Sequence, residues 1–176
     1  MWGDYSKNDW DCQIQFQKIS RFSDNPEINR GWIHQDGGAF CAAVVYLDPD
    51  ANLDHGTSIY RMKSDAERNA LPWQKKDCDP KLMQFHTDVL GPEQKRDKKS
   101  LEVFGNNMKI NNSMFERTLE VKNVYNRVIG YDGTQFHGQS NFHMDSDDEF
   151  RLTMVAFVTR ITKPATKLFE LKSRYI

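Results

Sequence analysis

Two side chains of metal-binding type, His34 and Asp36, lie two residues apart at the end of a short apolar run. In a β-strand, side chains at positions i and i+2 point to the same face, so an imidazole and a carboxylate at this spacing can bind one ion. The run before His34 predicts such a strand over residues 31–35. The segment therefore predicts half of a site for a divalent metal ion.

A third candidate ligand, His137, lies far downstream in residues 134–138. The Asp-Gly pair at 132–133 is typical of a tight hairpin turn, which would fix the direction of the next strand and of its imidazole. Two histidines and one carboxylate on one face, with coordination positions left open, form the facial triad that binds non-haem iron(II). We therefore predict that His34, Asp36 and His137 bind one Fe(II) ion.

Other histidines compete for these roles, because a His-x-Asp triplet is weak evidence by itself. The triplet formed by His86 and Asp88 falls within a predicted helix over residues 80–90, where i and i+2 point to nearly opposite sides. His143 lies in a polar, acidic loop, which is a poor setting for a preorganised ligand. His55 is expected to be an ordinary loop histidine.

Arg151 opens the apolar run of residues 151–161, the longest β-type segment of the chain. An arginine at the start of a buried strand should have a partner, unless it is simply a charge at the strand edge. Its planar guanidinium can bind a carboxylate through two hydrogen bonds. Thr153, two residues later on the same face, can add a hydroxyl donor. Together they predict a site for a carboxylate-bearing co-substrate.

Short β-type runs separated by turn residues make up most of the sequence, which favours a sandwich or barrel. One long connection between largely antiparallel strands suits a jelly roll. We therefore predict a mainly β fold of double-stranded β-helix or cupin-like type. The eight predicted strands cover residues 12–19, 31–35, 40–47, 56–62, 115–122, 125–131, 134–138 and 151–161.

Residues 63–113 interrupt this rhythm and are expected to form an insert within a single domain spanning residues 1–176. The predicted helix over 80–90 carries Leu82, Phe85 and Val89 on one face. The charged, Asn-rich stretch that follows, up to Asn112, is predicted to be an irregular excursion over the surface. A connection of this length lies near the mouth of a jelly roll, so we predict that the insert faces the substrate or a partner. The alternative is that the insert only packs onto the sheet.

Composition narrows the classes of partner. The chain of 176 residues is long enough to bury a core without disulfides or metals as staples. Lys and Arg together number 24 against 25 for Asp and Glu, so the charge balance gives no case for nucleic acid or an anionic membrane as a partner. The three cysteines show no Cys-x-x-Cys spacing. With no apolar leader and no membrane-length run, a cytoplasmic location is expected.

The order and strand context of these residues resemble the iron(II)- and 2-oxoglutarate-dependent oxygenases of the double-stranded β-helix type. That superfamily places His-x-Asp after its second core strand, a distal His near the seventh, and Arg-x-Ser/Thr on the eighth. The segment 125–131 followed by Phe136 and His137 resembles, more narrowly, a family of small oxygenases of bacteria and phages. The resemblance covers residues 12–161, and a phage origin would place the protein in the host cytoplasm.

This resemblance implies Fe(II) bound by the triad, with 2-oxoglutarate and O2 as co-substrates and succinate and CO2 as co-products. Arg151 and Thr153 would bind the far carboxylate of 2-oxoglutarate. Trp32 and Tyr131 would lie on the substrate side, with a plain core aromatic as the alternative for Trp32. The N-terminal region is too short for the helices that support the major sheet in that superfamily. A monomer would lack this support, so a homodimer is a possible stable form.

The substrate implied is a protein side chain, an amino acid or a small metabolite, which would be hydroxylated. Two other classes of protein remain open from the sequence. A metal-binding cupin without 2-oxoglutarate chemistry would need no carboxylate clamp. A structural or binding jelly roll would carry a vestigial triad.

Overall fold

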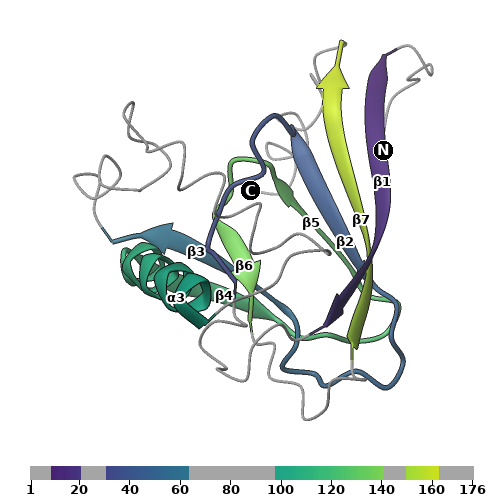
Figure 1. Ribbon diagram of the computed structural model, residues 1–176. Coiled ribbons are helices and arrows are strands. Elements are labelled where there is room, and N and C mark those ends of the chain that lie inside the picture. The colour runs from purple at the N-terminus through teal and green to yellow at the C-terminus, as the bar shows by residue number, and fades with distance from the viewer. Residues whose placement is uncertain (1–8, 21–30, 64–97, 141–149, 163–176) are drawn as a thin grey trace, which may run out of the picture.

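Most of the apolar runs identified in the sequence form strands of two antiparallel sheets, and the described part of the chain adds one helix, so the protein is mainly β (Figure 1). This computed structural model describes residues 9–20, 31–63, 98–140 and 150–162. Its elements are β1 (Trp10–Ser20), β2 (Cys41–Tyr46), β3 (Thr57–Met62), α3 (Lys98–Ser113), β4 (Phe115–Val121), β5 (Val128–Asp132), β6 (His137–Gln139) and β7 (Phe150–Ile161).

The larger sheet has the strand order β1-β7-β2-β5. Residues of β2 alternate between half-buried and buried, as the period of two in a strand requires. Val44 lies opposite both Val155 on β7 and Ile129 on β5, and Tyr46 lies opposite Thr153. Since Val44, Tyr46 and Val155 are buried together, this face of the sheet forms one half of the core.

The smaller sheet has the order β4-β3-β6 and carries a second core cluster. Phe115 and Phe136 pack with a ring-centroid distance of 4.7 Å, and Ile33 lies against them. Ile33 comes from the segment that carries His34 and Asp36. Burial of this one side chain therefore ties the first candidate ligands to the smaller sheet.

The Asp-Gly pair at 132–133 does not form the predicted hairpin. β5 pairs with β2 in the larger sheet, whereas β6 pairs with β3 in the smaller one, so the chain crosses between sheets here. The turn is closed by the Gln135 N–H, which donates to Asp132 O at 2.9 Å. A Cβ atom at Gly133 would lie 1.9 Å from the carbonyl oxygen of Ala39, so only glycine fits this crossing.

Seven of the eight predicted strands are confirmed in kind, with shifted ends, but the strand over residues 31–35 is not. Within that segment only His34 forms a bridge, to His137. Gly31 has a φ of 73°, in the left-handed region, which interrupts a strand at its start. β5 begins at Val128 instead of residue 125 because Asn126, with a φ of 62°, belongs to a preceding turn.

The predicted helix over residues 80–90 lies outside the described residues. The prediction of an irregular stretch up to Asn112 is wrong for residues 98–112, because Lys98–Ser113 forms α3. Gly105, Met108 and Asn111 are the buried positions of its last turns, at helical spacing. An asparagine at a buried position breaks the apolar pattern, which is why periodicity did not reveal this helix.

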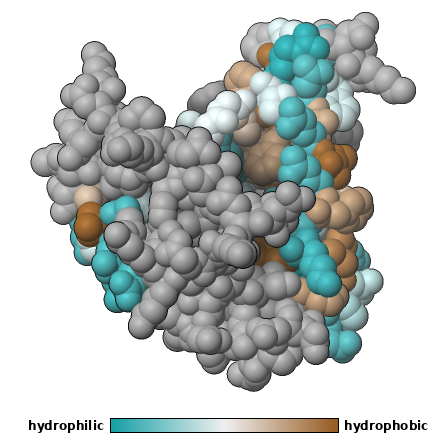
Figure 2. All heavy atoms as spheres, in the orientation of Figure 1, coloured by the Kyte–Doolittle hydropathy of each residue, from teal (hydrophilic) through white to brown (hydrophobic). Residues whose placement is uncertain are grey.

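The outer face of the larger sheet is unusually apolar for an exposed surface. Ile14 and Phe16 on β1 are 59% and 71% exposed, and Val128 on β5 is 61% exposed. Figure 2 shows hydrophobic, brown residues along the right-hand side of the molecule, where β1 and β7 run, with hydrophilic ones between them. Within the described part of the chain, no helix is long and apolar enough to span a membrane.

Candidate metal centre

Backbone pairing brings the three predicted ligands together. His34 and His137 form an antiparallel bridge in which each N–H donates to the other's carbonyl, at 3.0 and 2.9 Å. Two residues on, the Asp36 N–H donates to Gly133 O at 3.0 Å. The segment after β1 thus runs beside the crossing between β5 and β6, and this pairing fixes the relative positions of all three side chains.

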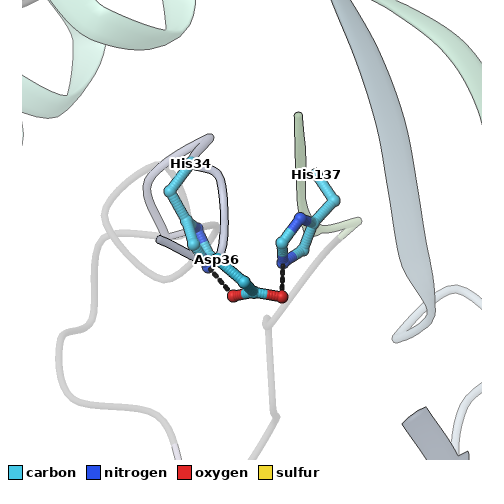
Figure 3. Close-up of side chains that lie close together, drawn as sticks. All are labelled: His34, Asp36 and His137. Atoms are coloured by element: carbon cyan, nitrogen blue, oxygen red, sulfur yellow. Dashed lines mark ion pairs between the residues drawn. The ribbon is translucent and has the colours of Figure 1, made fainter. Parts of the chain in front are cut away.

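The side chains of His34, Asp36 and His137 converge on one point (Figure 3). One Asp36 oxygen, Oδ1, lies 3.7 Å from His34 Nε2, and the other, Oδ2, lies 3.5 Å from His137 Nε2. The potential ligand atoms all lie within 4.8 Å of one another. Metal–ligand bonds of about 2.0–2.2 Å place neighbouring ligand atoms roughly 3 Å apart, so small side-chain movements would close this cluster on an ion.

Both imidazoles are oriented in the same way. His34 Nδ1 lies 2.8 Å from the carbonyl oxygen of Trp32, and His137 Nδ1 lies 3.0 Å from that of Gln135. Because a carbonyl only accepts, each Nδ1 carries the proton and donates it. The Nε2 lone pairs are thereby left to face Asp36, which is the arrangement by which outer hydrogen bonds fix metal-ligating histidines.

The lone pairs and the negative charge of this cluster favour the binding of a cation. Burial and the neighbouring His34 imidazole lower the pKa of His137, which favours its neutral form. Asp36 Oδ2 is buried and accepts no hydrogen bond from the described residues. With the Nδ1 atoms protonated, nitrogen lone pairs and carboxylate oxygens face one another, and a bound cation satisfies all of them at once. The His34 side chain is 50% exposed, so one side of the cluster faces solvent.

Arg151 and Thr153 lie side by side on the inner face of β7, both buried, as the sequence predicted. Arg151 Nη1 donates to the carbonyl oxygens of His55 and Gly56, at 2.7 and 2.9 Å. Burial lowers the pKa of Arg151 to about 10, so its guanidinium stays charged at neutral pH. The Thr153 hydroxyl is fully buried and makes no hydrogen bond within the described residues.

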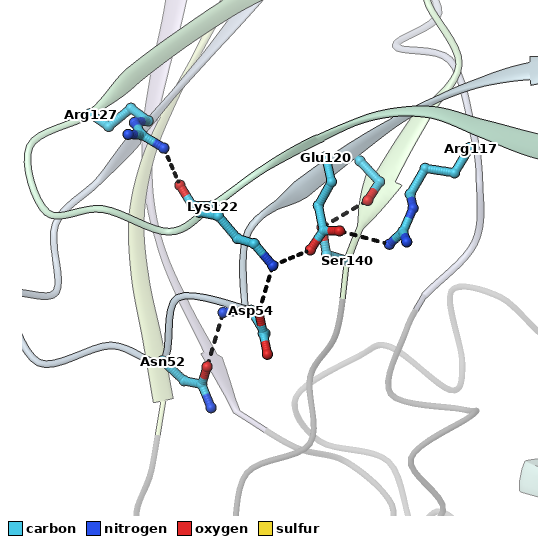
Figure 4. A network of polar contacts seen from close by, with 8 residues as sticks. Asn52, Asp54, Arg117, Glu120, Lys122, Arg127 and Ser140 are labelled. Carbon is cyan, nitrogen blue, oxygen red and sulfur yellow. Dashed lines mark hydrogen bonds and ion pairs between the residues drawn. The ribbon is translucent and has the colours of Figure 1, made fainter.

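The loop that supplies these two carbonyls is held against β4 by a surface network (Figure 4). Lys122 Nζ contacts Asp54 Oδ1 at 2.6 Å and Glu120 Oε1 at 2.9 Å. Behind it, the Asn123 N–H donates to Leu53 O at 2.9 Å. The exposed ion pairs contribute little free energy singly, but together these contacts fix the position of the loop beside Arg151.

Tyr131 connects the triad with the buried arginine. Its ring packs against His137 with a centroid distance of 4.5 Å. Burial and the Asp36 carboxylate raise the pKa of Tyr131, while the Arg151 charge opposes this rise. Tyr131 therefore lies within electrostatic reach of both groups and keeps its proton at neutral pH. Trp32 is half-buried and holds His34 through its carbonyl, and a place for its indole on the substrate side stays a prediction.

Sequence reasoning missed several contributors to this site. The carbonyl of Gln135, the buried Tyr46 beside Arg151, and the side chains of Asn111 and Asn112 at the end of α3 all support it. Carbonyls leave no sequence signal, and the two asparagines lie far from any ligand motif. The competing candidates at residues 86, 88 and 143 lie outside the described residues.

The family of unknown function DUF6445 matches residues 17–158. This match spans the triad, Arg151 and Thr153. It includes β2 to β6 entirely, the last four residues of β1, and β7 up to residue 158. No curated protein and no solved structure matches the chain. The chain belongs to the DUF6445 family.

Proposed function

We propose that the protein is an Fe(II)- and 2-oxoglutarate-dependent oxygenase with a double-stranded β-helix fold. The observation that carries this proposal is the pairing of the His34–Asp36–His137 cluster with a buried, charged arginine through Tyr131. A metal site alone would support many activities. Here the buried guanidinium of Arg151 lies near the candidate metal site, and together they could bind a co-substrate with two carboxylates.

The strand order supports this architecture. In a jelly roll the chain crosses repeatedly between two sheets. Here it passes from β1 to the bridge at His34, back to β2, on to β3 and β4 in the smaller sheet, and then through β5, β6 and β7 in alternate sheets. The bridge adds the His34 segment beside β6 in the smaller sheet. With it counted as the second strand, β6 and β7 become the seventh and eighth, which carry the distal histidine and the arginine.

In this function, His34, Asp36 and His137 would hold Fe(II), because two histidines and one carboxylate are the ligand set of non-haem iron oxygenases. Iron, when bound, supplies the oxidation chemistry, with succinate and CO2 as co-products. The residues of this chain orient the reactants. The Nδ1 hydrogen bonds to Trp32 O and Gln135 O keep both imidazoles in the ligating tautomer.

Arg151 and Thr153 would bind the distal carboxylate of 2-oxoglutarate. The guanidinium is already held in place by the His55 and Gly56 carbonyls, so little side-chain entropy is lost when the anion binds. The Thr153 hydroxyl provides a buried donor for the same carboxylate. Tyr131 is protonated at neutral pH, so its hydroxyl can donate a hydrogen bond to the bound 2-oxoglutarate.

The proposed substrate is a small molecule or a peptidyl side chain, which enters from the solvent side marked by the exposed His34. The charge balance of 24 basic to 25 acidic residues offers nothing that would attract a nucleic acid. Hydroxylation of an aliphatic carbon is the proposed reaction.

Succinate release from 2-oxoglutarate, with Fe(II) and ascorbate but without a prime substrate, tests the proposal. The expected result is slow, metal-dependent succinate formation that is lost in His137→Ala. Metal binding without any succinate would indicate a cupin that does not use 2-oxoglutarate. Absence of both would indicate a structural or binding jelly roll.

A further inference from the structure

The segment that carries His34 is bonded on both edges, although only one neighbour is a strand. On one edge, His34 bridges His137. On the other edge, the Ile33 N–H donates to Asn112 Oδ1 at 3.0 Å, and Asn112 Nδ2 donates to Gly31 O, also at 3.0 Å. Asn111 Nδ2 donates to Ile33 O at 3.0 Å. Two side chains therefore occupy the place of a neighbouring strand.

The Asn112 carboxamide makes the same two hydrogen bonds as one residue of a neighbouring strand in a parallel ladder. In such a ladder, one residue donates to the carbonyl of residue i−1 of its neighbour and accepts from the N–H of residue i+1. Asn112 makes these two bonds to Gly31 and Ile33, and so brackets Trp32. The carbonyl of Trp32 in turn accepts the Nδ1 proton of His34 at 2.8 Å.

The two asparagines are themselves firmly held. Asn111 is fully buried, and its Nδ2 also donates to Asn112 Oδ1 at 2.9 Å. They lie in the last turn of α3, directly before β4. Phe115, which opens β4, packs on Ile33 from the same side. A movement of the helix end would therefore move the Trp32 peptide and rotate the His34 imidazole.

We propose that Asn111 and Asn112 are positioning residues of the metal centre, through which α3 sets the orientation of His34. This inference rests on the metal binding in the proposed function, but not on the oxygenase reaction. It gives α3, the C-terminal part of the insert, a role in the site, because the asparagines of α3 hold the segment that carries His34. Loss of an outer hydrogen-bond partner of a metal ligand typically weakens metal affinity by about 10- to 100-fold.

Titration of the full chain with Co(II), followed by visible absorption, tests this role without turnover. Asn112→Ala removes the bonds of the carboxamide, and Asn112→Asp keeps the acceptor for Ile33 but loses the donor to Gly31. Asn112 acts one step further out than the Trp32 carbonyl, so we expect both variants to bind Co(II) more weakly by up to about 10-fold, the low end of that range, with an altered absorption spectrum. Asn106→Ala, an exposed asparagine of the same helix, is the matched control and should bind as wild type does.

The result that overturns the inference is wild-type Co(II) affinity and spectrum in both Asn112 variants, even if their melting temperatures fall. A fall in stability alone would show that the asparagines support only the fold. Co(II) binding by the wild type without succinate release would remove the oxygenase proposal and leave this inference intact. No Co(II) binding by the wild type would overturn both.

Discussion

His34 and His137 exchange backbone hydrogen bonds across 103 positions of sequence, and their rings lie with centroids 4.4 Å apart. Each ring is also held by a carbonyl two residues before it in its own chain segment. The same backbone pairing therefore aligns the two segments and aims both Nε2 atoms at Asp36. The geometry of the candidate metal centre therefore depends on this bridge.

Replacing His34 should abolish metal retention while leaving the fold largely intact. The His34 side chain is half exposed and contributes little to the core, so His34→Ala should keep its far-UV circular dichroism spectrum. Fe(II) ranks low in divalent affinity, so equilibrium dialysis with Ni(II) or Co(II) is the better measurement. His86→Ala, from the competing triplet, is the control. Loss of the metal in that variant, with retention in His34→Ala, would contradict the proposed ligands.

Replacing Arg151 should weaken 2-oxoglutarate binding with little change in metal affinity. A charge-assisted pair contributes on the order of 1.5–3 kcal/mol, which corresponds to roughly a 10- to 100-fold loss of affinity. Arg151→Lys should recover only part of this, because an ammonium cannot make both hydrogen bonds of the fork. Anaerobic calorimetric titration of the Co(II)-loaded protein provides the measurement.

The control for this titration is Arg160→Ala on the same strand, where the side chain is exposed and pairs with Asp11. It should bind 2-oxoglutarate as the wild type does. Unchanged binding in Arg151→Ala would place the carboxylate elsewhere, and would favour a cupin without this co-substrate.

Gly133→Ala should disrupt the crossing between the sheets. The new Cβ would lie 1.9 Å from a backbone oxygen, which cannot move without shifting the segment before β2. Overpacking of this kind costs about 1–3 kcal/mol, and the free energy of unfolding measured in urea should fall by that amount. Gly37→Ala is the matched control, since nothing lies within 4 Å of its Cβ position. Equal stability of the two variants would contradict the close approach at Gly133.

Tyr131 should make the protein less stable in alkali. Its pKa is raised in the folded state by burial and by Asp36, whereas in the unfolded chain it ionises near its usual value of about 10. The stabilising contribution is complete below that pH and is lost as the pH rises toward the folded pKa. The melting temperature should therefore fall less between about pH 9 and about pH 11 in Tyr131→Phe than in the wild type. An identical decline in both proteins would show that Tyr131 is not the group responsible.

The sequence was sufficient to place most of the strands and to select three candidate ligands that the structure brings together. The apolar runs at 40–47 and 151–161 form β2 and β7, the two central strands of the larger sheet. The two-residue spacing of His34 and Asp36 indicated a pair of ligands on one face. Arg151, at the start of an apolar strand, indicated a buried group that binds a carboxylate. Local patterns suffice for such features because strand alternation and ligand type are properties of short segments.

Three features were decided only by the tertiary structure. The turn at Gly133 crosses between sheets because β5 and β6 pair with different strands, β2 and β3, that lie far away in the sequence. The buried side of α3 accommodates Asn111 because the fold supplies acceptors for its amide group. The His34 segment is not a regular strand, since side chains of α3 replace one of its neighbours. Hydrogen-bond partners more than seventy residues apart leave no trace in local composition, so the fold had to bring them together before their roles could be recognised.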